Sequence, residues 1–216
     1  MKIVLFGAGG TVARSIAREA LERGHRVTGV VRDAASFHSY DDRMRVVDGD
    51  GTDAASVARV AAGADVIVSA LSPRPSPSGR AASSLASAAR ALLAGASKAG
   101  VKRLVIVGGA GSLVVAPGTM LMDAPGFPDA YKPEAIQHKE ALDIYRASKN
   151  DVNWTFMSPA VEIGPGPRTG HYRRGDDQVL ADAAGKSFIS FDDYAVALLD
   201  EIEHPTHPRA RMTVAY

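Results

Sequence analysis

The sequence contains no cysteine, few aromatic residues and no marked excess of either charge. The absence of cysteine excludes disulfide bonds, thiolate catalysis and cysteine-ligated metal sites. Aromatic residues make up 6% of the chain, and the formal net charge is +1. Nucleic-acid-binding domains carry a basic excess that is missing here, so we expect no nucleic-acid partner.

Long hydrophobic runs are also missing. No window approaches the roughly 18 consecutive apolar residues of a membrane span, and glycines interrupt the first run, 3–6, soon after it begins. We therefore expect a soluble, cytoplasmic protein with no membrane contact. A chain of 216 residues suits one α/β domain, 1–216, with a single full core.

What the sequence does contain is an alternation of short apolar runs with segments of helical spacing. The predicted strands are 3–6, 27–31, 44–47, 66–70, 104–107, 154–157 and 212–215, and the predicted helices are 12–21, 53–62, 85–100, 133–148 and 190–203. This alternation predicts a Rossmann-type, doubly wound parallel sheet covered by helices on both faces. We expect a proline-rich loop at 72–80 and a small C-terminal substrate lobe at 159–190.

Three glycines, Gly7, Gly9 and Gly10, follow the first predicted strand. Sheets of this class bind ligands beyond the carboxyl ends of their strands, where glycine permits a tight turn and a close approach of a pyrophosphate. The spacing fits Gly7-x-x-Gly10-x-x-Ala13, but it fails G-x-G-x-x-G because Val12 occupies the third glycine position. A plain strand-to-helix turn is the alternative interpretation.

The ends of the second and third predicted strands carry charges that bear on the cofactor. An arginine at the end of the second strand accommodates the 2′-phosphate of NADP(H), whereas a carboxylate accepts from the ribose of NAD(H). Arg32 comes before Asp33, so we favour NADP(H) over NAD(H), with a solvated charge as the alternative. Asp50 is placed to accept from an adenine amino group, or else Asp50 or Thr52 caps the next helix.

These segments resemble a known family. The glycine loop, "VVRD", "VVDGD", "ADVIVSAL" and "VKRLVIVGGAGSL" are similar to the atypical short-chain dehydrogenase/reductases. Within them, the sequence resembles the NmrA-like, NAD(P)H-binding group often labelled NADH-flavin reductases, with biliverdin reductase B as a distant relative. "NWTFMSPA" (153–160), "RTGHYR" (168–173) and "SFISFDDYAVALLDEIEHP" (187–205) extend the resemblance over nearly the whole chain.

The resemblance implies which residues hold the cofactor. The pyrophosphate would lie against Gly7, Gly9, Gly10, Thr11 and Val12, with Arg32 at the 2′-phosphate and Asp50 and Gly51 beside the adenine. Ala70, Leu71 and Ser72 would line the ribose and nicotinamide, and Gly108, Gly109 and the residues up to Ser112 would border the nicotinamide face.

The sequence departs from ordinary dehydrogenases of this superfamily in its proton donor. Those enzymes use a Tyr-x-x-x-Lys pair, but Tyr131 is followed at that spacing by Ala135. Tyr145 and Lys149 have the spacing, yet they lie at the end of a predicted helix, away from the expected site. A flavin or quinone accepts hydride without a strong acid, so it is the favoured acceptor. Ser112 is the best remaining catalytic candidate, with a local backbone role as the alternative.

The acceptor side is predicted in the long loop 113–131 and in the lobe. Met120, Met122, Phe127 and Tyr131 suit a flat ring, although a homodimer contact or surface packing would use the same residues. Arg168, with Arg173, Arg174, Arg74 and Arg80, would meet an anionic acceptor such as a flavin phosphate, or would be solvated charges.

The carboxylates of the last helix, at 192, 193, 200 and 201, are predicted as capping and solvent-facing charges. His204 and His207 lack accompanying carboxylates, so no metal site is expected.

The favoured function is therefore an NADPH-dependent oxidoreductase that passes hydride to a flavin or quinone, chiefly by juxtaposing two flat rings. Two alternatives stay open. One is a redox sensor that binds NADP(H) without turnover, and the other is a protein that reduces or isomerises a specialised metabolite.

Overall fold

The computed structural model describes residues 1–73 and 84–216. Most of the loop predicted at 72–80 lies outside the described residues, and so do Arg74 and Arg80.

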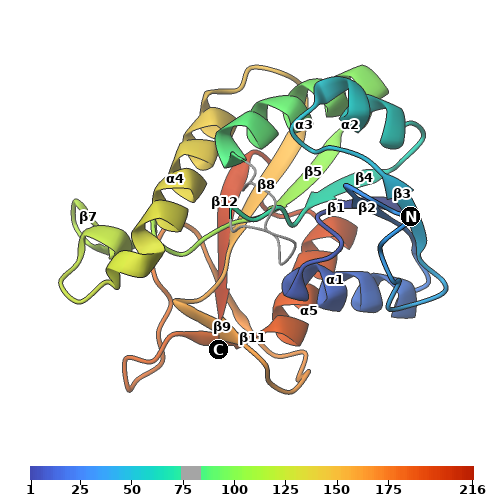
Figure 1. The fold of residues 1–216 in the computed structure, drawn as a ribbon. Helices are drawn as coiled ribbons and strands as arrows, with labels where there is room; N and C mark the ends of the chain where they lie inside the picture. The colour runs from blue at the N-terminus through green and yellow to red at the C-terminus, as the bar shows by residue number, and fades with distance from the viewer. Residues whose placement is uncertain (74–83) are drawn as a thin grey trace.

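One eight-stranded sheet runs through the molecule in the order β10-β12-β8-β5-β4-β1-β2-β3 (Figure 1). Its strands are β1 (Lys2–Phe6), β2 (Arg26–Val31), β3 (Arg45–Asp48), β4 (Val66–Ser69), β5 (Arg103–Val107), β8 (Asn153–Ser158), β10 (Arg173–Gly175) and β12 (Ala210–Ala215). Neighbouring strands are parallel except β10, which is antiparallel to β12. The chain winds outward from β1 in one direction and from β4 in the other, so the switch point of this doubly wound sheet lies between them.

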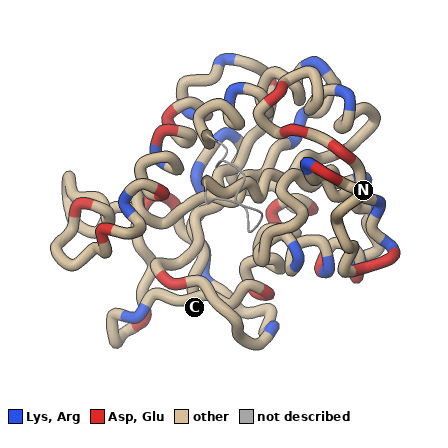
Figure 2. Tube along the Cα trace, in the orientation of Figure 1, with Lys and Arg blue, Asp and Glu red and all other residues tan. Residues whose placement is uncertain are grey.

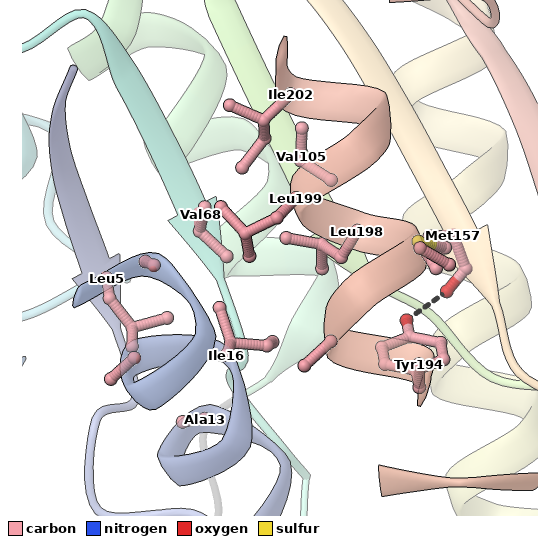
Figure 3. Packing of buried hydrophobic residues seen from close by; sticks show 14 of the residues in the cluster. Leu5, Ala13, Ile16, Val68, Val105, Met157, Tyr194, Leu198, Leu199 and Ile202 are labelled. Atoms are coloured by element: carbon pink, nitrogen blue, oxygen red, sulfur yellow. Dashed lines mark hydrogen bonds between the residues drawn. The ribbon is translucent and has the colours of Figure 1, made fainter. Parts of the chain in front are cut away.

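Helices cover both faces of the sheet (Figure 1). Helices α1 (Thr11–Glu22) and α5 (Phe191–Glu203) pack on one face, and α2 (Ala54–Val60), α3 (Leu85–Ala99) and α4 (Lys132–Ala147) pack on the other. Figure 3 shows the α1–α5 side, where Leu198 and Leu199 of α5 face Val68 and Val105 of the sheet. The arrangement confirms the predicted Rossmann-type fold with two buried hydrophobic layers.

Local signals explain several helix ends. Helix α3 ends at Gly100, whose φ of +73° is a left-handed conformation that glycine adopts without strain. Helix α5 begins after Ser190, whose Oγ accepts a hydrogen bond from the Asp193 backbone N–H at 3.0 Å, as the predicted capping box requires. The cap of α2 corrects our alternative, because Asp53 accepts from the Ala55 N–H at 2.9 Å and neither Asp50 nor Thr52 is the N-cap.

Short strands that the sequence pattern did not indicate complete the fold. Strands β9 (Glu162–Gly164) and β11 (Phe188–Ser190) form a small parallel sheet within the 159–190 lobe, while β10 joins the main sheet. The predicted long loop, 113–131, contains the hairpin of β6 (Val114–Ala116) and β7 (Thr119–Met120), followed by 3-10 turns at Leu121–Asp123 and Asp129–Tyr131. Figure 1 shows this hairpin at the outer end of α4, across the molecule from α1.

Candidate functional site

The glycine loop follows β1 at the switch point and forms a tight turn. Gly7 has a φ of +80°, and its carbonyl accepts from the Gly10 N–H at 3.0 Å. A Cβ at Gly7 would lie 2.6 Å from the Ala70 carbonyl oxygen, closer than any side chain tolerates. Gly7 is therefore required both for its backbone conformation and for the close approach of the segment after β4.

Helix α1 begins with backbone donors that no described side chain caps. Its N-cap, Gly10, has no side-chain capping bond, and its first turn carries no acidic residue. At this end of the helix, the Arg14 N–H donates to the Gly10 carbonyl at 3.1 Å. Ala13 is fully buried against the sheet, where the third small residue of a dinucleotide-binding turn permits close helix–strand packing. These features fit a pyrophosphate, which the positive end of the helix attracts.

Three loops meet at the carboxyl ends of β1, β3 and β4. Gly7 lies against Ala70, as described above. A Cβ at Gly51 would lie 2.6 Å from Leu71 Cδ1 and 3.3 Å from Phe6 Cδ1, so the loop after β3 also contacts the segment after β4. The structure thus brings Gly7, Gly51, Ala70 and Leu71 together, although their sequence positions are far apart. A dinucleotide spans loops arranged in this way.

The loop after β2 supplies the neighbouring surface. Arg32 directly follows β2 and is exposed. Aromatic residues from the same loop flank the glycines, with Phe37 Cε2 3.6 Å from a Cβ placed at Gly9. The Arg14 guanidinium lies 4.9 Å above the Tyr40 ring, whose edge-on contact with Phe37 spans 6.1 Å between centroids. Burial raises the pKa of Tyr40 to about 12, so it stays a neutral phenol.

Asp50 is partly occupied within its own loop. Its Oδ1 accepts from the Thr52 N–H at 2.8 Å and from the Thr52 hydroxyl at 2.7 Å. Its backbone N–H donates to Ser56 Oγ at 2.9 Å, which fixes the loop against α2. The adenine contact of Asp50 stays a prediction, and it would use the second carboxylate oxygen.

The loop after β5 packs closely against its neighbours, because three of its residues are glycines without side chains. A Cβ at Gly108 would lie 2.2 Å from Phe156, one at Gly109 2.8 Å from His138, and one at Gly111 2.4 Å from the Ala135 Cβ. The Gly109 carbonyl accepts from Ser158 Oγ at 2.9 Å. These contacts hold the predicted nicotinamide border rigidly against β8 and α4.

Ser112 has a buried ionic partner that the sequence did not indicate. Its side chain is only 6% exposed, and its Oγ accepts from Arg211 Nη2 at 2.6 Å while its carbonyl accepts from Nη1 at 3.0 Å. Burial lowers the pKa of the Arg211 guanidinium to about 10, which leaves it charged at neutral pH. This geometry gives Ser112 the role of a loop anchor, and its catalytic contact stays a prediction.

The apolar residues predicted for the acceptor differ in their placement. Met122 is buried, with its Cβ 3.6 Å from a Cβ placed at Gly111, so it supports the loop after β5. Met120, in β7, and Phe127, further along the 113–131 segment, are partly exposed. Tyr131 is 57% exposed at the start of α4. Of these residues, only Met122 has a described contact with the predicted nicotinamide border.

Arg168 pairs with the protein itself. Its Nε and Nη2 donate to the two carboxylate oxygens of Glu19 at 2.7 Å each. Glu19 is 4% exposed on α1 and also accepts from Arg23 Nε at 2.8 Å. This bidentate pair joins the lobe to α1. Arg168 is therefore engaged within the protein and is not part of the acceptor site that we propose.

Two acidic residues of α5 correct the prediction of solvent-facing charges. Asp193 and Glu201 are both 0% exposed. Asp193 accepts from Thr169, Gly170 and Tyr216, which ties α5 to the lobe. Glu201 pairs with Arg103 at 3.0 Å. Both are buried with partners, as buried charges must be.

His138 is a buried titratable group that the sequence analysis missed. It lies on the buried stripe of α4 beside Gly109, with Nε2 3.9 Å from Glu134 Oε1. Its ring meets Phe156 edge-on at 6.3 Å. Two features of the sequence could have indicated this residue. His138 interrupts the otherwise apolar buried stripe of α4, and Glu134 lies four residues before it, where the two side chains can interact. Tyr145, by contrast, is buried between Trp154 and Phe156, so its spacing to Lys149 is incidental.

Comparison with known proteins agrees with this geometry. A model of the NAD(P)H-binding family matches residues 7–205. The uncharacterized protein YwnB of Bacillus subtilis (strain 168) is 40% identical over 217 residues, covering 99% of this chain and 98% of that protein.

Two solved structures are similar over the whole chain. One, named as a candidate exported protein of Burkholderia pseudomallei, is 45% identical with a TM-score of 0.88 and full coverage of both chains. The other, named as a candidate NADH-flavin reductase of Streptococcus pneumoniae TIGR4, is 31% identical with a TM-score of 0.84, covering 100% of this chain and 99% of the other.

One of these proteins is named as a candidate exported protein, and the cytoplasmic compartment of this chain stays a prediction. Among the helices of residues 1–73 and 84–216, none combines the length and apolar character needed to cross a membrane. The glycine turn, the three converging loops and the matched relatives agree on one assignment. The chain belongs to the NAD(P)H-binding family and has the Rossmann fold.

Proposed function

We propose that this protein is an NADPH-preferring reductase that delivers hydride to a flavin or a quinone. The observation that carries the proposal is the tight turn at Gly7, which lies against the Ala70 carbonyl at the switch point and brings the glycine loop to the segment after β4. The Streptococcus relative, named as a candidate NADH-flavin reductase, supports the choice of acceptor.

The residues of the chain would act mainly by binding and orientation. The amides at the start of α1 would hold the pyrophosphate, and Arg32 would bind the 2′-phosphate with its planar fork. The bound cofactor would supply the hydride. The rigid backbone at 108–111 would fix the ring plane, with His138 and Met122 behind it. Holding two flat rings in contact supplies much of the catalytic effect in such a transfer.

The absence of a tyrosine–lysine donor pair supports a planar acceptor over a ketone. Tyr145 is buried in the core, and Tyr131 precedes α4 with Ala135 at the critical spacing. A ketone needs a proton as the hydride arrives, whereas a flavin or quinone stabilises the added electrons in its own ring system.

A spectrophotometric screen tests this proposal. NADPH oxidation would be followed with free FMN, FAD, a set of quinones and small ketones, each with NADH in parallel. We expect turnover with a flavin or quinone, a preference for NADPH, and little activity with ketones. Rapid ketone reduction would contradict the proposal. Tight NADPH binding without turnover on any acceptor would support a non-catalytic redox sensor instead.

A further inference from the structure

A second concave site lies at the opposite end of the sheet from the glycine loop. It is an open cavity of about 680 Å³ at the amino ends of β1, β2 and β3, bordered by the turns that follow α1 and α2. Its cationic lining includes Lys2, Arg26, Arg45 and Arg59, and its lining contains no aspartate or glutamate. We call it the basic cavity. Its volume is within the range of small-molecule sites, about 300–1,000 Å³.

Strand register explains why the cations gather. Lys2 of β1 pairs with Arg26 of β2, and Thr28, two residues further along β2, pairs with Arg45 of β3. Alternate residues of a strand face the same side of a sheet, so Lys2, Arg26 and Arg45 share one face. It is the face covered by α2 and α3, since Val4 and Val30 belong to the hydrophobic cluster on that side.

The short helix α2 leaves this part of the face open. It ends at Val60, and Arg59 projects from its last turn, with Nη2 3.3 Å from the Asp48 carbonyl. Val4, Val47 and Val60 form an apolar part of the lining beside the cations. The basic cavity therefore combines positive charge with an apolar wall.

Four cations of the basic cavity have no carboxylate partner in the part of the chain that the structure describes. Among the described residues, Lys2, Arg26, Arg45 and Arg59 take part in none of the ion pairs, whereas Arg43, which also lines the cavity, pairs with Asp41. His25 pairs with Glu203, and Asp65 accepts from the Lys2 backbone N–H. Like charges placed opposite each other on neighbouring strands are destabilising. Figure 2 shows acidic and basic residues interspersed along the described chain.

We propose that the basic cavity binds a small, multiply phosphorylated metabolite. Three guanidinium groups and one ammonium group suit phosphate oxygens, because arginine bonds them in pairs and lysine adds a point charge. The apolar wall would accommodate a base or another flat body. The small net charge of +1 favours a compact ligand over a nucleic acid. The site is separate from the glycine loop and does not rest on the proposed reductase activity.

Isothermal titration with inorganic triphosphate tests this proposal, with and without saturating NADP⁺ to occupy the glycine loop. The double variant Arg26→Gln/Arg45→Gln removes two cations, and Arg90→Gln, an exposed arginine of α3, is the matched control. We expect one site that persists with NADP⁺, weakens at least tenfold in the double variant and changes less than twofold in the control. Added salt should weaken the binding. Without ligand, the double variant should be at least as stable as wild type, because it relieves like-charge repulsion.

Three results would overturn the proposal. Triphosphate binding that is absent at millimolar concentration would remove the site. Binding that NADP⁺ abolishes and the double variant does not affect would assign the anion to the glycine loop. A single-stranded oligonucleotide that binds more tightly than triphosphate, with loss in the double variant, would make the surface a nucleic-acid site. The reductase screen is unaffected by all three results, so the two proposals fail separately.

Discussion

Arg32 is the residue on which cofactor choice depends in the proposed function. Arg32→Ala should weaken NADPH binding about ten- to a hundredfold, because a charge-assisted hydrogen bond contributes about 1.5–3 kcal/mol. NADH affinity should barely change, since NADH lacks the 2′-phosphate. Titration of both cofactors against wild type, Arg32→Ala and the control Arg90→Ala measures the effect. Equal wild-type affinities for the two cofactors would show that Arg32 does not recognise the phosphate.

Gly7 offers a test in which strain and steric clash can be separated. Gly7 and Gly63 both have positive φ, +80° and +73°, but only Gly7 has backbone within reach of a new Cβ. Gly63→Ala should cost about 1–2 kcal/mol of unfolding free energy from backbone strain alone. Gly7→Ala should cost more and should also abolish cofactor binding, because the Ala70 carbonyl must move. Urea unfolding and cofactor titration of both variants provide the comparison, and equal losses would contradict it.

Ser112 can be tested as a loop anchor. Ser112→Ala leaves Arg211 Nη2 without its buried acceptor, which should lower the unfolding free energy by about 1–3 kcal/mol. Turnover should fall with the loosened loop, while the Kd for NADPH stays nearly unchanged, because the pyrophosphate lies at another loop. Ser87→Ala, at an exposed serine of α3, is the control. Reduced turnover at wild-type stability would instead show a direct contact between Ser112 and the acceptor.

At the scale of elements, strong local signals were the ones that predicted structure correctly. Gly100 and the Ser190 cap mark helix ends whose causes lie within a few residues. The strands that were missed depend on distant partners: β10 is Arg-Arg-Gly and becomes a strand only by pairing with β12. Asp53 is the N-cap of α2 because it directly precedes the helix, whereas the Asp50 carboxylate accepts from the Thr52 hydroxyl.

The attachment of the lobe to α1 should depend on pH through Glu19. The hydrogen bond from Arg168 is the largest cause that lowers the pKa of Glu19 below its ordinary 4.5. A lowered carboxylate pKa contributes stability that is present above about pH 4.5 and is lost as the pH falls through the folded-state value. Wild type should therefore lose this contribution in acid.

Glu19→Gln should remove the contribution at all pH values. Because Arg168 is 49% exposed, solvent screening limits the expected loss at pH 7 to about 1–2 kcal/mol. Denaturant unfolding between pH 3 and pH 7 should show a smaller pH dependence in the variant than in wild type. The control Glu22→Gln, an exposed residue of the same helix, should behave as wild type. Parallel pH curves for wild type and Glu19→Gln would contradict this account.

At the scale of the molecule, topology explains how much of the site was predictable. Strand–helix alternation predicts that the carboxyl ends of the parallel strands lie at the same edge of the sheet. The convergence of Gly7, Gly51 and Leu71 therefore follows from the order of elements. The partners of Ser112 and Arg168 did not follow, because Arg211 and Glu19 lie about a hundred residues or more away in sequence. No local pattern indicates which distant charge a buried group will meet.

Cofactor binding should also stabilise the molecule as a whole. A ligand that binds only the folded state adds about 2.7 kcal/mol at one hundred times its Kd. Thermal unfolding should therefore shift upward with NADPH, and Arg32→Ala should need proportionally more NADPH for the same shift. Scanning fluorimetry over a concentration series measures this effect. An NADPH-independent unfolding temperature would show that the folded protein does not bind the cofactor.

The position of β12 has a consequence for synthesis on the ribosome. β12 lies between β8 and β10, yet it is made after both of them. At translation rates of about 5–20 residues per second, several seconds pass between the synthesis of β8 and that of β12, the strand that pairs with its edge. An unpaired strand edge is a site for aggregation or chaperone binding. The half of the sheet that carries the glycine loop can pair earlier, so a nascent chain would assemble its nucleotide side before its acceptor side is closed.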